Sequence, residues 1–379
     1  MARPTHDVLV IGAGIVGAAC ALALQREGLD VGLVDAATPG AGVTAAGMGH
    51  LVALDESADE LALCLRSLQL WERFMDAHPD VGEPSRCGTL WVAEDAHQLA
   101  EARQRAERLC RHGRSAEALT GDQLQRLEPA LRRGLCGGVR VAGDSVVYPP
   151  AVAQFLARQA RAGGATLYLG RRVVALGAGV ATLADGVRLG AGQIVLAAGA
   201  EMAALLPEVP VFGRKGHLAI TERYPGRLAH QVVSMNYGQS AAGADALAVA
   251  ANVQPRPTGQ WLVGSCRQDG QSDTRLDPSV LARMLRSAIA LLPELGQMQI
   301  VRAWTGMRPA TPDGRPLIGP HPWREHLWLA GGHEGLGVTT SFASAELLAD
   351  QLMGRGGALD GAPYLPARFE SMRSERHGN

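Results

Sequence analysis

The chain has 379 residues, of which 47% are hydrophobic and 19% are charged. This composition is typical of a globular protein and excludes an intrinsically disordered one. Lysine and arginine number 36 against 37 aspartates and glutamates, so the formal net charge is -1. Such a balance argues against a general nucleic-acid binder and against a protein that binds acidic membranes. The length exceeds what one hydrophobic core usually serves and predicts two domains.

The apolar stretch at residues 8–24, VLVIGAGIVGAACALAL, is uncharged and nearly long enough to cross a bilayer. It also resembles the apolar region of a signal peptide. However, Asp7 precedes it, glycines interrupt it, and its β-branched start gives way to an alanine-rich end. These features predict a buried strand followed by a helix, with no transmembrane segment.

The six cysteines include no pair at the spacing of a CxxC zinc or iron–sulfur motif. Their density does not favour a disulfide framework either. We therefore expect reduced thiols, no metal site and a soluble, cytoplasmic protein. If the protein works with an iron–sulfur cluster, that cluster must then be carried by another chain.

A glycine motif follows the first predicted strand. Gly12 suits a tight turn, Gly14 lets the backbone reach a pyrophosphate, and Gly17 lets helix and strand pack closely. Asp35 ends the next predicted strand, where a carboxylate accepts hydrogen bonds from a ribose diol. A strand before, a helix after and an acid at this distance predict a dinucleotide site. Its expected residues also include Ala13, Ile15, Val16 and Ala36.

The segment after Asp35 helps to distinguish nicotinamide from flavin. A nicotinamide dehydrogenase normally continues into a crossover helix, whereas residues 39–51, PGAGVTAAGMGHL, form a loop of small residues. Such a narrow, hydroxyl-bearing loop is suited to line a pyrophosphate and dock a flat ring. Its expected contacts are Thr44, Ala45, Ala46, Gly47 and Met48.

With this loop the sequence resembles the FAD-dependent D-amino-acid oxidase superfamily, which includes glycine oxidase, sarcosine oxidase and D-amino-acid dehydrogenase. Four further motifs occur in the family's order, at residues 146–176, 193–200, 306–319 and 327–352. The resemblance implies non-covalent FAD, because no cysteine occupies the C-terminal motif and Trp304 lies nearby instead. The further FAD contacts that it implies are Val173, Ala198, Gly199, Gly306, Arg308, Gly335, Leu336, Gly337, Val338 and Thr339.

The resemblance also implies an α/β fold in which a Rossmann-like FAD-binding domain is interleaved with an α+β substrate domain built on an antiparallel sheet. The expected FAD-binding domain comprises residues 1–85, 143–215 and 300–379, and the substrate-binding domain comprises residues 86–142 and 216–299.

Local patterns agree with this division. Residues 95–135 are charged and helical in pattern, whereas residues 217–224 and 260–266 have the pattern of antiparallel strands. Apolar spacing predicts a helix over 277–295 with Asp277 as its N-cap.

Arg308 lies between Met307 and Pro309, in the G-L/M-R-P motif that holds the substrate carboxylate in the family. A guanidinium matches a carboxylate with two parallel hydrogen bonds, which a lysine does not. The alternative is an arginine paired with a buried carboxylate or with loop carbonyls. With the flavin motifs present, we expect Arg308 to bind the substrate carboxylate.

His50 and His333 are further candidates for the catalytic site. His50 follows the flavin loop and either contacts substrate or caps the loop. His333 and Glu334 belong to GGHEGLG, a departure from glycine oxidase that removes that family's second arginine. This variant resembles D-hydroxyproline dehydrogenase and the related cyanide-producing glycine dehydrogenase subunit. Tyr148 and Tyr237 are candidates to shape the pocket, although lone tyrosines are more often core residues.

The resemblance implies a dehydrogenase that transfers a hydride from the α-carbon of a D-amino or cyclic imino acid to flavin N5. The best substrate guesses are cis-4-hydroxy-D-proline and D-proline. Two alternatives stay open, a glycine- or sarcosine-type oxidase that makes peroxide and a non-catalytic FAD-bearing subunit.

Electron-transfer partner subunits are a further expectation, with FMN or an iron–sulfur cluster on them or shared with them. The basic pair Arg214 and Lys215 is either part of such a subunit boundary or a solvated pair. A peripheral association with the respiratory chain is compatible with such electron transfer.

Overall fold

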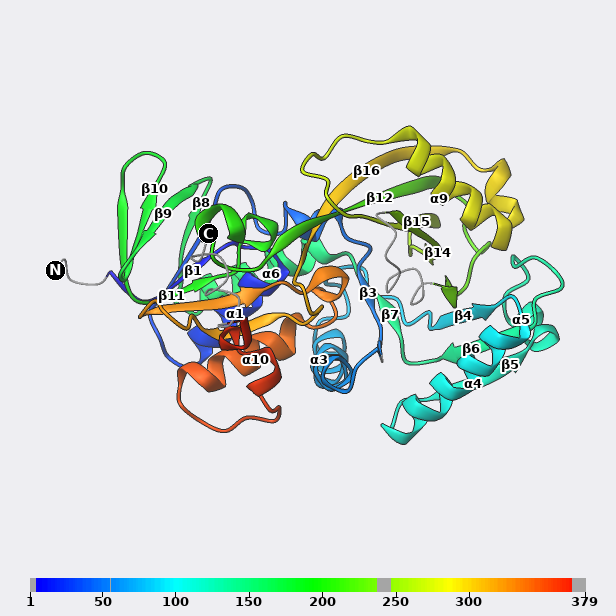
Figure 1. Ribbon diagram of the computed structural model, residues 1–379, viewed down its shortest axis with the longest axis horizontal. Helices are drawn as coiled ribbons and strands as arrows, with labels where there is room; N and C mark the ends of the chain where they lie inside the picture. Colours follow the sequence, from blue (N-terminus) through cyan, green and yellow to red (C-terminus); the bar gives the residue numbers. More distant parts are fainter. Residues whose placement is uncertain (1–4, 55, 237–246, 370–379) are drawn as a thin grey trace, which may run out of the picture.

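The computed structural model describes residues 5–54, 56–236 and 247–369. Two eight-stranded sheets lie side by side along the long axis of the molecule (Figure 1). Strands of the first sheet come from the start, middle and end of the chain, and strands of the second sheet come from the segments between them. The predicted α/β class, with an interleaved antiparallel sheet, is confirmed.

The first sheet has the strand order β17-β18-β11-β1-β2-β8, and the hairpin β9-β10 extends it from β11. Neighbours from β18 to β8 run parallel, as in a dinucleotide-binding fold. Its strands are β1 (His6–Ile11), β2 (Val31–Asp35), β8 (Thr166–Leu169), β9 (Val173–Gly177), β10 (Val180–Leu183), β11 (Arg188–Leu196), β17 (Leu317–Pro320) and β18 (Leu327–Gly331).

One face of this sheet is covered by helices. Helix α1 packs against both α6 and α10, and α10 packs against α3. The largest buried cluster joins these helices to β1 and β2, and a second cluster fills the opposite face. The helices of this part are α1 (Ile15–Arg26), α2 (Val43–Ala46), α3 (Ala58–Ala77), α6 (Pro149–Ala162), α7 (Met202–Leu205) and α10 (Ser341–Leu352).

The second sheet has the order β16-β12-β15-β14-β13-β4-β6-β5 and is antiparallel except where β13 meets β4. Helix α9 packs on β14 and β15 and buries its apolar side against them (Figure 1). The strands are β4 (Thr89–Ala93), β5 (Ala116–Thr120), β6 (Gly137–Val141), β12 (Phe212–Arg223), β13 (Gln231–Ser234), β14 (Leu247–Pro255), β15 (Gln260–Gln268) and β16 (Ile300–Ala310). The helices are α4 (Ala96–Arg111), α5 (Gly121–Leu127) and α9 (Pro278–Leu291). A short pair, β3 (His50–Leu51) and β7 (Ser145–Val146), is separate from both large sheets.

Two local predictions need correction. The helix expected over 277–295 does begin at the Asp277 N-cap, whose carboxylate accepts from the amides of Ser279 and Val280. It ends at Leu291, because Pro293 follows and disfavours helical backbone before it. The charged segment 95–135 is not wholly helical, since strand β5 interrupts it and pairs with β6.

The predicted domain boundaries stay a prediction. Strand β16 lies in the expected FAD-binding segment 300–379 but pairs with β12 in the second sheet. Within the part of the chain that the structure describes, no helix is both long enough and apolar enough to cross a membrane. Residues 8–24 instead form β1 and α1, as expected.

Candidate active site

A first cavity of about 530 Å³ lies where β1, β2 and β11 end and α1 begins. Its volume is typical of cofactor and ligand sites, which measure about 300–1,000 Å³. Ligands of open α/β sheets bind at this edge, beyond the carboxyl ends of the strands. The predicted cofactor residues that line the cavity are Gly12, Gly14, Ile15, Val16, Asp35, Ala36, Thr44, Val173, Ala198, Gly199, Gly335, Gly337 and Val338.

Close backbone packing explains the glycines at this edge. Gly12 has a φ of +103°, and a Cβ on it would lie 2.5 Å from the carbonyl oxygen of Ala197. A Cβ on Gly17 would lie only 1.9 Å from the carbonyl oxygen of Gly12. The turn and the first turn of α1 can therefore pack together only without side chains. The helix N-terminus then presents its backbone amides to the cavity, where they attract phosphate.

Asp35 lies at the rim of the first cavity with its carboxylate held by two amides. Oδ2 accepts from the nitrogen of Ala13 at 2.6 Å, and Oδ1 accepts from the nitrogen of Ala37 at 2.7 Å. An ionised carboxylate has about four lone-pair sites, so acceptors remain for a ribose diol. The glycine turn, the helix amides and this fixed carboxylate fit the dinucleotide part of FAD.

The loop after Asp35 closes over the glycine turn. Thr44 Oγ1 accepts from the amide of Ile15 at 3.0 Å, which ties α2 to the start of α1. On its other side, Ala46 packs against β16, where a Cβ on Gly306 would lie 2.6 Å from the Ala46 Cβ. Met48 packs with Leu218 and Leu262 of the second sheet. This loop therefore connects the two sheets at the cavity.

Some predicted residues support the cavity walls rather than lining them. Those that line neither this cavity nor the second one are Ala13, Gly17, Ala45, Ala46, Gly47, Met48, Gly306, Arg308 and Thr339. The sequence interpretation in turn missed Arg171, Arg172, Val174, Ala197, Pro309 and Gly331, which do line the first cavity. Each of them lies within two positions of a predicted residue along the chain, which was the available signal.

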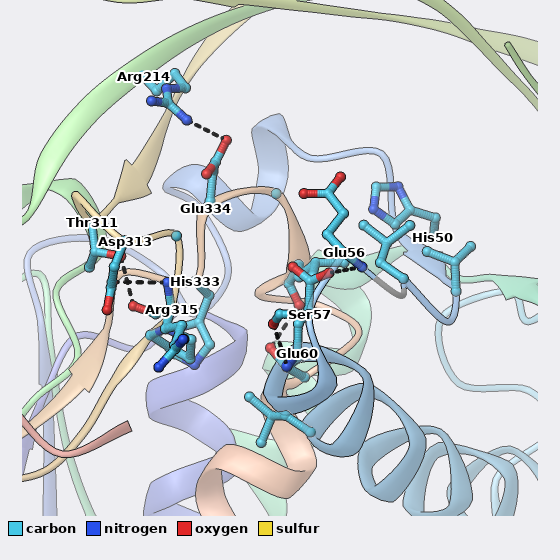
Figure 2. A pocket seen from close by; sticks show the side chains of 18 of the residues that line it. His50, Glu56, Ser57, Glu60, Arg214, Thr311, Asp313, Arg315, His333 and Glu334 are labelled. Carbon is cyan, nitrogen blue, oxygen red and sulfur yellow. Dashed lines mark hydrogen bonds and ion pairs between the residues drawn. The ribbon is translucent and has the colours of Figure 1, made fainter. Parts of the chain in front are cut away.

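A second cavity of about 370 Å³ adjoins the first, since His333, Glu334 and Gly335 line both. Its walls come from residues 50–54 and 56–63, the second sheet and the loops at 311–316 and 333–336. Figure 2 shows these walls, with Glu334 directed toward Arg214 and away from the group formed by Thr311, Asp313 and Arg315. Charged and polar side chains therefore make up much of this cavity's wall, whereas small and apolar residues predominate in the first.

Arg308 lies on β16 beside Gly335, a residue that lines both cavities. Its Nη1 donates to the carbonyl oxygen of Cys266 at 2.8 Å. The guanidinium crosses β12 at Gly216, where a Cβ would lie 2.4 Å from Nη1, and its Cδ and Nε border Gly335. Among the residues that the structure describes, no carboxylate forms an ion pair with Arg308. The arginine is half-buried and held in place without a counter-charge.

His50 lies on β3, lines the second cavity and faces the charge of Arg308. Burial, together with Arg308, lowers the pKa of His50 to about 4, so the imidazole is neutral at physiological pH. Within the described chain, its buried Nδ1 has no hydrogen-bond partner. Thr339 holds the strand, since its hydroxyl donates to the His50 carbonyl at 3.0 Å. His50 is therefore a fixed, neutral group with one unused polar atom.

The loop at 333–340 is held from behind. Trp71 of α3 donates from Nε1 to the carbonyl oxygens of Val338 and Thr339, at 3.1 Å each. His333 shares a 2.9 Å hydrogen bond with Ser344 Oγ, and burial lowers its pKa to about 4. His333 therefore has a side-chain partner inside the protein, whereas Nδ1 of His50 has no hydrogen-bond partner among the described residues.

Glu334 connects this loop to the second sheet. Its carboxylate accepts from Arg214 Nη1 at 2.8 Å and lies 3.2 Å from Arg267 Nε. Its φ of +49° is unusual for a residue with a side chain, and such strain is kept when surrounding contacts hold it. The two arginines supply these contacts.

The basic pair on β12 is not solvated. Arg214 also binds Asp269 at 2.6 Å, and the buried Lys215 donates to Asp273 at 3.0 Å. Their role at a subunit boundary stays a prediction. Tyr148 is exposed at the N-terminus of α6 and lines neither cavity, and Tyr237 lies outside the described residues. In the described ranges, no cluster of three or more metal-ligating side chains occurs.

Known proteins resemble the chain over nearly its whole length. It is 28% identical to glycine oxidase of Geobacillus kaustophilus over 95% of this chain and 96% of that protein. A glycine oxidase crystal structure from the same organism has a TM-score of 0.85 at 27% identity, covering 96% of this chain and 98% of that chain. The chain is 31% identical to D-amino acid dehydrogenase 2 of Ralstonia nicotianae, over 96% and 100% of the two proteins. It is 27% identical to hydrogen cyanide synthase subunit HcnC of Pseudomonas aeruginosa, over 97% of each.

Residues 7–351 match the family model described as DAO, FAD dependent oxidoreductase. The matched range includes the glycine turn, Asp35 and the loop that separates the two cavities. Since the residues that fit FAD all lie in this range, the chain belongs to the DAO family of FAD dependent oxidoreductases and is an enzyme.

Proposed function

We propose that this enzyme is a dehydrogenase that oxidises the CH–NH bond of a D-amino or cyclic imino acid, with Arg308 binding the substrate carboxylate. The observation that carries the proposal is the half-buried guanidinium of Arg308, which has no carboxylate partner among the described residues and borders Gly335, a residue that lines both cavities. An unpaired charge in such a place is costly, and a ligand carboxylate would compensate it.

The setting of Arg308 suits the capture of a carboxylate. The Cys266 carbonyl takes one N–H of Nη1, so the other guanidinium N–H groups remain for a ligand. Neighbouring Gly216 and Gly335 leave space around the guanidinium. A carboxylate would reach it past His50 and Gly335, which line the second cavity. Strand β16 holds the guanidinium of Arg308 in place, which reduces the entropy lost when a carboxylate binds.

His50 is placed to bind the amine, which is the second polar group on the substrate's α-carbon. A neutral imidazole beside Arg308 does not compete for the carboxylate, and its Nδ1 is available to the substrate amine. We propose that this atom accepts a hydrogen bond from the amine and favours the uncharged amine, which alone can be oxidised. Orientation and exclusion of water, rather than a strong base, then carry the reaction.

FAD, when bound, would supply the two-electron acceptor for oxidation of the single bond between the α-carbon and nitrogen to an imine. The chain's own residues bind the substrate and exclude water. Trp71, packed behind the 337–340 segment, fixes the wall between the cavities, and Thr339 fixes His50 against that wall. The imine product is released to hydrolyse, or tautomerises where it is part of a ring.

We propose a cyclic imino acid, cis-4-hydroxy-D-proline or D-proline, as the preferred substrate. The second cavity supports this, because its volume of about 370 Å³ exceeds what glycine needs. A relative named D-amino acid dehydrogenase 2 supports a D-amino acid, and the relative HcnC is named as a subunit of an assembly. Glycine oxidase is the second candidate, since relatives of that name are similar over the same length. A non-catalytic FAD-bearing subunit has no use for an unpaired arginine at this position.

The electrons must leave the enzyme after each turnover. We propose a partner chain, carrying FMN or an iron–sulfur cluster, as the acceptor in place of oxygen. Co-expression with candidate partner chains that carry FMN or an iron–sulfur cluster, followed by size-exclusion chromatography, tests whether a stable complex forms. A monodisperse single chain that transfers electrons directly to oxygen would remove the partner from the proposal.

The proposed activity is tested on the purified, FAD-loaded protein under nitrogen. We expect D-proline and cis-4-hydroxy-D-proline to bleach the flavin absorbance, and an artificial dye to restore it faster than oxygen does. Glycine and sarcosine serve as comparison substrates. Rapid peroxide formation with glycine or sarcosine would favour the oxidase, and no bleaching by any amino or imino acid would exclude the proposed function.

A further inference from the structure

The wall of the second cavity formed by the second sheet contains a row of side chains from three neighbouring strands. Trp91 of β4 is in register with Val233 of β13, and Val233 is in register with Asn252 of β14. All three line the same cavity, so they lie on one face of the sheet. Neighbouring strands are about 4.8 Å apart, so Val233 lies between the two polar side chains.

Both polar members of this row have an unused atom. Trp91 is 3% exposed and Asn252 is 6% exposed, yet Trp91 Nε1 and Asn252 Oδ1 have no hydrogen-bond partner among the described residues. Leaving a buried donor or acceptor unpaired is costly, because the atom has lost its hydrogen bonds to water. Such atoms normally meet a ligand or an ordered water. Here both belong to side chains that border a cavity connected to the site of Arg308.

Contacts on the other sides of the row restrict how it can move. The guanidinium of Arg105 lies 4.1 Å from the Trp91 ring centroid, which fixes the indole from one face. The neighbouring wall residue Gln231 donates from Nε2 to Thr89 Oγ1 and to the Ser145 carbonyl, both at 3.2 Å. The unused atoms are therefore held on a wall whose neighbours are already bonded.

The charge of this wall indicates what it binds. The Glu334 carboxylate lies between Arg214 and Arg267, and Asp269 forms a second ion pair with Arg214. These carboxylates match the two guanidiniums, so little positive charge remains for an anionic side chain. Arg308 stays the cation for the one carboxylate at the α-carbon. The part of the ligand that lies against Trp91 and Asn252 should then be polar and carry no negative charge.

We propose that Trp91 and Asn252 form a subsite for an uncharged polar substituent on the substrate, either a hydroxyl or a carboxamide. The inference rests on the proposed function, because it takes the α-carboxylate to be bound by Arg308. Trp91 donates to the substituent's oxygen, and Asn252 Oδ1 accepts from its O–H or N–H. Val233, between them, packs against the carbon chain or ring that carries it.

The subsite distinguishes between substrates because an unsubstituted ligand leaves its two buried polar atoms without hydrogen-bond partners. A substrate without the substituent would bury the Trp91 N–H and the Asn252 oxygen against carbon, whereas a hydroxyl or carboxamide satisfies them. Sites built to bind a polar group reject analogues lacking it more strongly than apolar pockets reject an added group. We therefore expect the hydroxylated member of each substrate pair to have the higher kcat/KM.

The experiment measures kcat/KM with a dye acceptor for matched pairs: D-proline with cis-4-hydroxy-D-proline, and D-alanine with D-serine. D-asparagine tests the carboxamide, and D-aspartate tests an anionic substituent. We expect roughly tenfold or greater preference for the hydroxyl or carboxamide member and the lowest value for D-aspartate. Absence of turnover with all of these substrates would overturn the proposed function itself. Turnover with a preference for the unsubstituted member, or for D-aspartate, would overturn only the subsite.

Two variants test the residues themselves. Trp91→Phe removes the N–H and keeps an aromatic ring, and Asn252→Leu removes the amide at similar volume. Each should reduce the preference for the hydroxylated substrate roughly tenfold, because the hydroxylated substrate loses a hydrogen bond and the unsubstituted one no longer leaves that polar atom unpaired. Gln254→Leu is the matched control, because Gln254 is buried with both amide atoms unpaired in the described chain but does not line the cavity. Its substrate preference should stay that of the wild type.

Binding of a non-reacting ligand gives a readout that does not depend on turnover. Dissociation constants for furan-2-carboxylate and its 4-hydroxy derivative are measured from the change in flavin absorbance. The hydroxylated ligand should bind more tightly to the wild type and lose that advantage in Asn252→Leu, even if Trp91→Phe fails to fold. An unchanged ratio in Asn252→Leu, or a loss as large in Gln254→Leu, would overturn the subsite.

Discussion

The two adjoining cavities are built in opposite ways. The first is formed mainly by backbone and small side chains, with glycines wherever helix α1 meets the strands. The second is formed by large and charged side chains from both sheets and from two loops. The first therefore fits a ligand by close approach of the backbone, and the second by individual side chains. A site formed by close backbone packing tolerates no added atoms at the packed glycines, whereas a site lined by side chains can change its ligand without losing its shape.

This comparison predicts where substitutions cause the largest losses. Gly17→Val places carbon atoms where a Cβ would already be 1.9 Å from the Gly12 carbonyl oxygen, so α1 must move away from β1. We expect loss of FAD binding, measured by the flavin absorbance of the purified protein. Gly47→Ala is the control, because Gly47 belongs to the loop beside the same cavity, has an extended backbone (φ -87°, ψ 163°), and a Cβ on it would make only ordinary contacts of 3.6 Å. Full FAD content in Gly17→Val would contradict a site formed by close backbone packing.

The next largest effect is expected from Arg308, which adjoins the second cavity. Arg308→Ala should retain FAD and lose about 2–5 kcal/mol of substrate transition-state binding in kcat/KM, as for a charge-assisted pair. Arg308→Lys should restore only part of the lost kcat/KM, because an ammonium lacks the fork geometry of a guanidinium. Arg302→Ala, at an exposed position of the same strand, should behave as wild type. An unchanged KM in Arg308→Ala would place the substrate carboxylate elsewhere.

The two cavities also differ in how well the sequence predicted them. The glycine turn and Asp35 lie within one strand–helix–strand unit, so spacing along the chain predicted them. The row of Trp91, Val233 and Asn252 depends on the register of three strands that are far apart in sequence. Nothing local indicates that register, and the sequence interpretation named none of the three. Arg308 and His50 were named because motifs mark them, but their relation to each other came from the fold.

A smaller effect should come from the ion pairs of the second cavity. Glu334→Gln removes the charge between Arg214 and Arg267 and keeps a side chain of equal length at the same positive φ. The uncovered guanidiniums should raise kcat/KM for D-aspartate relative to D-alanine by about tenfold, with FAD retained. Asp269→Asn is the matched control, since Asp269 also pairs with Arg214 but is exposed, so its effect should be weaker. Equal ratios in wild type and Glu334→Gln would show that these ion pairs do not control selectivity.

The smallest effect concerns the support behind the second cavity and is a change of stability with pH. Asp144 is fully buried, next to the β3–β7 pair that carries His50, and burial raises its pKa to about 7. The Thr89 hydroxyl and the guanidinium of Arg114, 3.8 Å away, only partly oppose this shift. The folded state therefore keeps a proton on Asp144 that the unfolded chain has already lost above its ordinary pKa of about 4.

The sign of the pH dependence follows from this difference. A carboxyl whose pKa is raised on folding stabilises fully below its unfolded pKa, and this contribution is lost as pH rises through about 7. Asp144→Asn stays neutral at every pH, so its free energy of unfolding should rise relative to that of the wild type by about 1 kcal/mol between pH 6.5 and pH 8. Urea unfolding at both pH values measures the difference, and Asp122→Asn, on the exposed surface of α5, is the control. A gap that stays constant with pH would mean that Asp144 is ionised in the folded enzyme, with Arg114 as its full counter-ion.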